Sequence, residues 1–67
     1  MTVTVNGIVR EFSADEATIP EFLELLELGP QPVLVELNGK AILVREFPDH
    51  TVSDGDTIEV IRMVAGG

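Results

Sequence analysis

The first five residues alternate between apolar and polar side chains. Val3 and Val5 are separated by a threonine, and this period of two with β-branched residues predicts a half-buried strand over 1–5. Asn6-Gly7 follows, a dipeptide typical of a type I′ hairpin turn, because both central residues of that turn need positive φ. The pattern therefore predicts a hairpin whose second strand covers 8–12.

A two-residue turn also fixes the expected register of this hairpin. It pairs Val5 with Ile8 and Val3 with Arg10. Arg10 is then expected on the apolar face of the sheet near its edge, where its aliphatic stem can pack and its guanidinium can reach water.

The next periodic stretch has helical spacing and follows a polar connection at 13–17. Thr18 and Glu21 have the spacing of a capping box, and Pro20 suits the first helical turn, where its missing N–H costs nothing. Gly29 followed by proline is a stop signal, so we expect a helix that ends at about residue 28. Its expected buried stripe consists of Ile19, Phe22, Leu23 and Leu26. We expect the glutamates Glu21, Glu24 and Glu27 to face outward, and Leu25 and Leu28 to be partly exposed.

A second hairpin is predicted after the helix. Strand patterns at 33–37 and 40–44 flank Asn38-Gly39, the second tight-turn signal of the chain. Residues 45–48 break the strand pattern. They predict a short turn or 3₁₀ piece with Phe47 packed inward.

The last strand is expected at 57–63, after an irregular stretch at 49–53. Between them, the run Ser53-Asp54-Gly55-Asp56 predicts a turn, because these residue types tolerate or require unusual backbone angles. Gly55 is expected to supply positive φ, and the carboxylates of Asp54 and Asp56 are expected to bond local amides.

The predicted order is strand, strand, helix, strand, strand, short break, strand. A helical crossover can place the first and last strands side by side as parallel neighbours. One helix across a mixed sheet of four or five strands is an α+β arrangement, and we predict the β-grasp, or ubiquitin-like, fold. A length of 67 residues indicates a single domain, 1–67.

Composition narrows the function classes. The chain has no cysteine and one histidine, His50, so thiolate chemistry is excluded and no metal site is predicted. Four basic against twelve acidic residues give a net charge of −8, which opposes binding to nucleic acid or to anionic membranes and suits a basic docking face. No apolar run approaches the ~20 residues of a membrane helix and no signal peptide is recognisable, so a cytoplasmic location is expected.

The sequence ends in Val64-Ala65-Gly66-Gly67, directly after the last strand pattern. Glycine has no Cβ, so a diglycine can enter a channel that is closed to other residues. We therefore predict a flexible tail over about 64–67, held out by a small stable body. A body this small rarely builds the cleft of an enzyme, which favours a carrier or binding module.

Three stretches make the chain resemble the ThiS family of ubiquitin-like sulfur carriers. They are Leu37-Asn38-Gly39-Lys40 with the apolar run after it, the run 52–60 around Asp-Gly-Asp, and the diglycine end. The resemblance covers nearly the whole chain. It implies that the protein is a co-substrate on which partner enzymes act, and not itself an enzyme.

The resemblance also implies a reaction sequence. A ThiF-type adenylating enzyme would use ATP to convert the Gly67 carboxylate to an acyl-adenylate, while Gly66, Ala65 and Val64 thread into its active site. Sulfur from a cysteine desulfurase or related donor would displace AMP and leave a thiocarboxylate at Gly67. A thiazole synthase of the ThiG type would then take the sulfur for thiamin biosynthesis. No permanently bound cofactor is expected.

Other functions stay open on the sequence alone. MoaD-type carriers of molybdopterin synthesis share the fold, the diglycine end and the adenylation step, and related carriers serve cysteine or siderophore synthesis and tRNA thiolation. Conjugation to proteins is a further outcome. A hypothesis of another class is a ubiquitin-like interaction domain that binds through its acidic and apolar faces. The sequence favours a surface or turn position for His50 and assigns no role to Lys40, Arg45 or Arg62.

Overall fold

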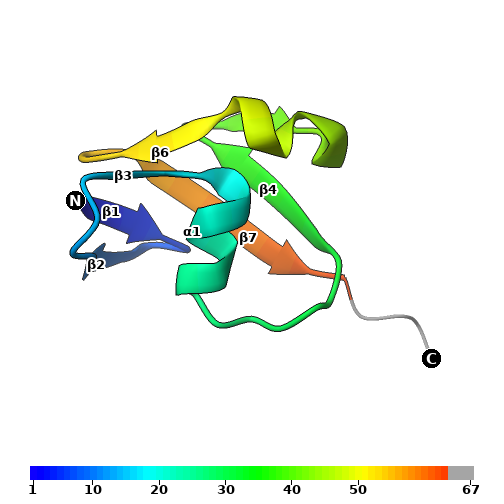
Figure 1. The fold of residues 1–67 in the computed structure, drawn as a ribbon, viewed down its shortest axis with the longest axis horizontal. Coiled ribbons are helices and arrows are strands. Elements are labelled where there is room, and N and C mark those ends of the chain that lie inside the picture. The colour runs from blue at the N-terminus through cyan, green and yellow to red at the C-terminus, as the bar shows by residue number, and fades with distance from the viewer. Residues whose placement is uncertain (64–67) are drawn as a thin grey trace.

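The computed structural model describes residues 1–63, which form a five-stranded mixed sheet with one α-helix across it (Figure 1). The sheet strands are β1 (Thr2–Val5), β2 (Ile8–Glu11), β4 (Val33–Leu37), β5 (Lys40–Ile42) and β7 (Thr57–Arg62). They lie in the order β2-β1-β7-β4-β5, with β1 and β7 parallel and the other neighbours antiparallel. The predicted fold class and the parallel pairing of the first and last strands are confirmed. The predicted tail lies outside the described residues.

The first hairpin has the predicted register. Val5 lies opposite Ile8 and Val3 lies opposite Arg10. The turn residues Asn6 and Gly7 have φ values of 50° and 83°, as a type I′ turn requires. Arg10 is exposed on the face that carries the helix, so its predicted position is also confirmed.

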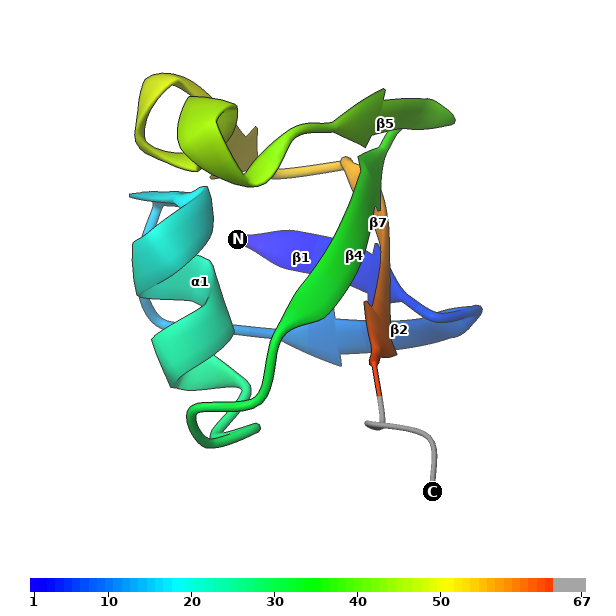
Figure 2. The same cartoon turned by 90° about the vertical axis from the view of Figure 1, so that its right-hand side faces the viewer.

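One face of the sheet forms the core. The helix α1 (Ile19–Leu25) and the 3₁₀ helix η1 (Val44–Asp49) lie against this face, while no helix of the described chain covers the other face (Figure 2). Strand alternation decides which side chains are buried, since successive residues point to opposite faces. The buried apolar residues of the described chain are Val3, Val5, Ala17, Ile19, Phe22, Val33, Val35, Ile42, Phe47, Val52, Ile58 and Val60.

The helix ends earlier than predicted. Its C-cap is Leu26, and the residue that leaves it with positive φ is Glu27, at 56°, and not Gly29. The Glu27 amide donates to the Glu24 carbonyl, a bond three residues back that tightens the last turn. The early end has a packing reason, because it turns Leu28 back so that it packs on the core, while Leu25 stays 44% exposed.

Two short strands were not predicted. Residues assigned to a polar connection and to an irregular stretch contain β3 (Glu16–Thr18) and β6 (Thr51–Ser53), which pair antiparallel as a second sheet. Ala17 and Val52 lie opposite one another in this pair and are buried. Three-residue strands are too short to show a period of two, so the sequence pattern could not reveal them.

The stretch between β5 and β6 is partly as expected. Phe47 is buried within η1, which confirms the predicted 3₁₀ piece. The strand predicted at 40–44 is shorter, because η1 already begins at Val44. Leu43 and Val44 are therefore exposed rather than part of the core.

The start of α1 is held by the predicted capping box. The Thr18 amide and hydroxyl donate to the Glu21 carboxylate, each at 2.9 Å, and the Glu21 amide donates back to the Thr18 hydroxyl at 3.4 Å. The bond from the backbone of Thr18, followed by that from its hydroxyl, lowers the pKa of Glu21 below its ordinary value of 4.5. Both bonds favour the ionised carboxylate.

Glu21→Gln should make the stability of the fold depend less on pH in the acidic range. Because the folded-state pKa is lowered, the ionised carboxylate stabilises the fold above the unfolded pKa, and this contribution is lost as the pH falls through the folded pKa. The variant should therefore be less stable at neutral pH and lose less stability on acidification. Urea unfolding across that range measures both effects. Glu27→Gln removes the same charge at the other helix end, and an equal change in its pH profile would contradict the prediction.

Candidate functional site

The predicted tail follows the central strand β7 and Met63, and we call the end of β7 together with Met63 the tail root. β7 lies between β1 and β4, with Ile58 and Val60 buried against the helix side. Beyond the end of the strand, the Met63 amide still donates to the Pro32 carbonyl at 2.9 Å. The backbone is therefore held by hydrogen bonds up to the residue that precedes the tail.

Both Asn-Gly turns bind β7 through the asparagine side chain. Asn6 donates from Nδ2 to the Val60 carbonyl at 3.1 Å and accepts the Val60 amide at Oδ1 at 2.8 Å. Asn38 accepts the Thr57 amide at Oδ1 at 2.9 Å and donates from Nδ2 to Asp56 at 3.1 Å. Two turns far apart in the sequence thus fix the start and the middle of the same strand.

From the sequence alone, both asparagines are predicted only as hairpin-turn residues. A signal for the second role exists, since asparagine carries both a donor and an acceptor, whereas an ionised aspartate can only accept. Asn6 uses both groups on one residue of a neighbouring strand. Replacement by aspartate would keep the turn propensity and leave the Val60 carbonyl without this donor.

The turn before β7 is structural. Gly55 has a φ of 86°, and Asp56 accepts the Ser53 amide at 2.8 Å, both as predicted. Asp54 differs, because it accepts the amide of Thr2 at 2.7 Å, 52 residues away, and no local amide bond to it is formed in the described chain. The Gly55 amide in turn donates to the Thr2 carbonyl at 2.8 Å, so the turn is tied to the start of β1.

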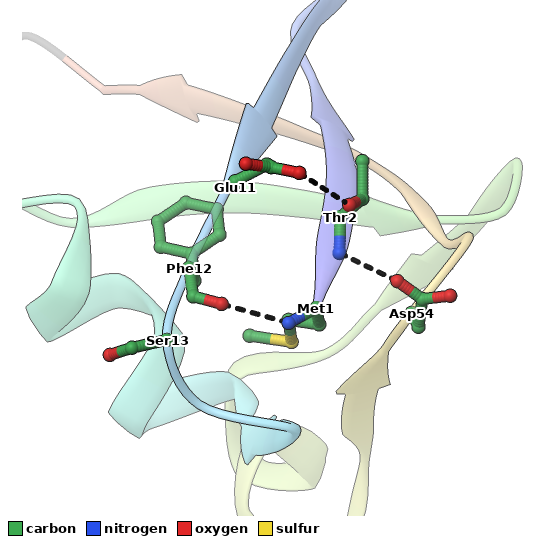
Figure 3. A pocket seen from close by; sticks show the side chains of 6 residues that line it. All are labelled: Met1, Thr2, Glu11, Phe12, Ser13 and Asp54. Atoms are coloured by element: carbon green, nitrogen blue, oxygen red, sulfur yellow. Dashed lines mark hydrogen bonds between the residues drawn. The ribbon is translucent and has the colours of Figure 1, made fainter.

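A polar hollow beside this turn uses its groups for the fold (Figure 3). The Met1 ammonium donates to the carbonyls of Phe12 and Ala14, both at 2.8 Å, and the Thr2 amide is held by Asp54. The Thr2 hydroxyl donates to the Glu11 carboxylate at a long 3.5 Å, and both groups are in a hollow that opens broadly to solvent. Within residues 1–63, no group of three or more metal-ligating side chains occurs.

His50 occupies a turn, as expected. It is half-buried at the end of η1, where its amide donates to the Phe47 carbonyl at 3.2 Å and its carbonyl accepts the Ile19 amide at 3.0 Å. These backbone bonds join η1 to the first turn of α1.

Among the described residues, no helix has the length and apolar character needed to cross a membrane.

The face of the sheet opposite the helix carries an exposed apolar pair. Leu34 on β4 and Ile61 on β7 lie directly opposite one another and are 55% and 54% exposed. Met63, two residues after Ile61, is 49% exposed. Next to this pair, Glu36 and Glu59 also lie opposite one another and are exposed. The tail root is thus bordered by an apolar and an acidic surface.

Comparison with known proteins matches this arrangement to one family. The family model described as the ThiS family matches residues 3–67. The chain is 40% identical over 65 residues to a protein of Thermus thermophilus named sulfur carrier protein ThiS, covering 97% of this chain and 98% of that one. It is also similar to a crystal structure of a thiamine biosynthesis protein, ThiS, from Geobacter metallireducens, with a TM-score of 0.86, 35% identity and complete coverage of both chains.

A further relative is of a different length. The chain is 31% identical over all 67 residues to a protein of Paramagnetospirillum magneticum named thiazole synthase, of which it spans 20%. The assignment of this chain to a family is based on the two full-length matches, since each exceeds 30% identity and covers nearly all of both proteins. The resemblance expected from the sequence is confirmed, and the chain belongs to the ThiS family of sulfur carriers.

Proposed function

We propose that this chain carries sulfur for thiamin biosynthesis as a thiocarboxylate at Gly67. A partner enzyme transfers AMP from ATP to the Gly67 carboxylate and releases pyrophosphate. Hydrosulfide from a sulfur donor then attacks the acyl carbon, AMP leaves with the electron pair of its bond to that carbon, and loss of the S–H proton to water leaves the thiocarboxylate. The carboxylate needs this activation because its own oxygen is a poor leaving group. The observation that carries the proposal is a family match that extends through the diglycine.

The fold supports the proposal because it gives the tail a fixed starting point. β7 is central in the sheet and is bound at Thr57 and Val60 by the two turn asparagines. From Met63 the chain can extend by ~3.3–3.6 Å per residue, so 63–67 span roughly 16–18 Å. That reach suits a carboxylate delivered into an enzyme while the body stays outside.

We infer three partners for this cycle. A thiazole synthase of the ThiG type accepts the sulfur, and its support is the similarity to a protein of that name. A ThiF-type adenylating enzyme and a cysteine desulfurase supply activation and sulfur. The exposed pair of Leu34 and Ile61 beside the tail root offers these enzymes an apolar contact, and the net charge of −8 suits a basic docking face.

The direct test is intact-mass analysis after incubation with the adenylating enzyme, ATP and a sulfide source. A single exchange of oxygen for sulfur is expected at the C-terminal residue, and it should depend on ATP. The thiolated chain should then support thiazole formation by a thiazole synthase. Absence of the mass change would overturn the proposed activation. A thiolated chain that supplies molybdopterin formation and no thiazole would overturn the pathway assignment alone.

A cytoplasmic location is part of this proposal, and cell fractionation checks it.

A further inference from the structure

Two of the four basic residues of the chain meet at one pocket beside the tail root. Arg10 on β2 and Arg62 on β7 line a pocket of about 160 Å³. Apolar side chains complete it, among them Leu26 and Leu28 from the end of the helix and Val60 from β7. In a chain with twelve acidic residues, this pocket reverses the overall sign of charge locally. We refer to it as the Arg10–Arg62 pocket.

Two side chains of the Arg10–Arg62 pocket, Arg10 and Asn6, are held in place before any ligand arrives. The Cζ atom of Arg10 lies 5.3 Å from the centre of the Phe12 ring, a cation–π contact. Phe12 packs edge-on against the buried Phe22, with ring centres 5.0 Å apart. Asn6, which also lines the pocket, is fixed by its two bonds to Val60. A ligand therefore does not have to order Arg10 or Asn6 on binding, which lowers the cost of association.

We propose that the Arg10–Arg62 pocket binds a carboxylate side chain, followed by an apolar side chain, on the thiazole synthase that receives the tail. Guanidinium groups bind carboxylates through paired N–H donors. The apolar side chains of the pocket then contact the neighbouring apolar side chain of the partner. A free phosphate or other small anion has no apolar group that could make this contact. The inference rests on the proposed function and names a contact point for it.

The position of the pocket supports this occupant. Arg62 is followed by Met63 and then by the tail, so an enzyme that takes in the tail approaches this end of the sheet. The choice of thiazole synthase follows from the relative of that name, which contains a segment similar to the entire chain. An acidic group at this point would set the orientation of a carrier whose remaining surface is mostly negative, since a displaced carrier would bring like charges together.

The chain supplies a charge-matched test. Arg10→Glu/Arg62→Glu and Lys40→Glu/Arg45→Glu change the net charge equally, but Lys40 on β5 and Arg45 on η1 do not line the pocket. Calorimetric titration into thiazole synthase should show the first variant bound about tenfold more weakly or worse than wild type. The control should lose less than about threefold. Thermal unfolding checks the fold of each. Arg62→Glu alone keeps Arg10 on Phe12, so it tests the pocket if the double variant unfolds.

Each outcome decides the inference. A selective loss in the Arg10/Arg62 variants supports the pocket. Equal losses in both double variants would show a response to net charge only and overturn it. Wild-type chain that does not bind thiazole synthase, or loss of binding to the adenylating enzyme alone, overturns the choice of partner. Thiocarboxylate formation by the wild type is assayed separately, so failure of the proposed function is distinguishable from failure of the pocket.

Discussion

Phe22→Ala is expected to unfold a large fraction of the protein at room temperature. Phe22 is completely buried at the centre of α1 and meets the edge of the Phe12 ring. Removal of a buried phenylalanine side chain costs roughly 3–5 kcal/mol, because the transfer energy is lost and a cavity remains. A domain of this length has a total stability of only roughly 3–10 kcal/mol at the usual value per residue. The substitution therefore removes a large share of the total.

Thermal unfolding followed by circular dichroism measures this effect. The midpoint should fall by at least about 12 °C, given the usual shift per kcal/mol for a domain of 60–100 residues. Leu25→Ala is the matched control, since Leu25 belongs to the same helix and is 44% exposed. Its midpoint should change by only a few degrees. Comparable losses in the two variants would contradict the view that the core, and not the helix itself, carries the stability.

The burial of Phe22 could be predicted from the sequence because the local pattern around it is clear. The capping box at Thr18 and Glu21 sets the start of the helix, and the spacing of Ile19 and Phe22 sets its buried face. The two Asn-Gly turns likewise predicted both hairpins, and the first turn also predicted the register of its hairpin. These features are local, so a short sequence window contains all of the interacting residues.

Features that depend on distant partners were missed or only half predicted. β3 and β6 exist because Ala17 and Val52, far apart in the sequence, are buried opposite one another. Asp54 was expected to bond locally and instead binds the amide of Thr2. The Arg10–Arg62 pocket is of the same kind. Arg10 was placed correctly on its strand, but its neighbour Arg62 arrives from the other end of the chain.

The tail is the part of the site that sequence alone describes. The need for a small residue at position 66 can be tested by substitution with larger side chains. Gly66→Val should reduce the rate of thiocarboxylate formation about a hundredfold or more, because a misplacement of ~1 Å at a reacting centre can cost that much. The branched side chain would stand next to the reactive carboxylate in a channel that accepts glycine. Single-turnover kinetics with intact-mass detection measure the rate.

A graded pair of controls separates bulk from other causes. Gly66→Ala adds a single carbon and should give an intermediate rate, whereas Ala65→Gly adds none and should leave the rate near that of the wild type. The buried residues of the described chain lie between Val3 and Val60, so none of these changes should alter the unfolding temperature. A wild-type rate for Gly66→Val would contradict a narrow channel and leave Gly67 as the only tail residue on which the chemistry depends.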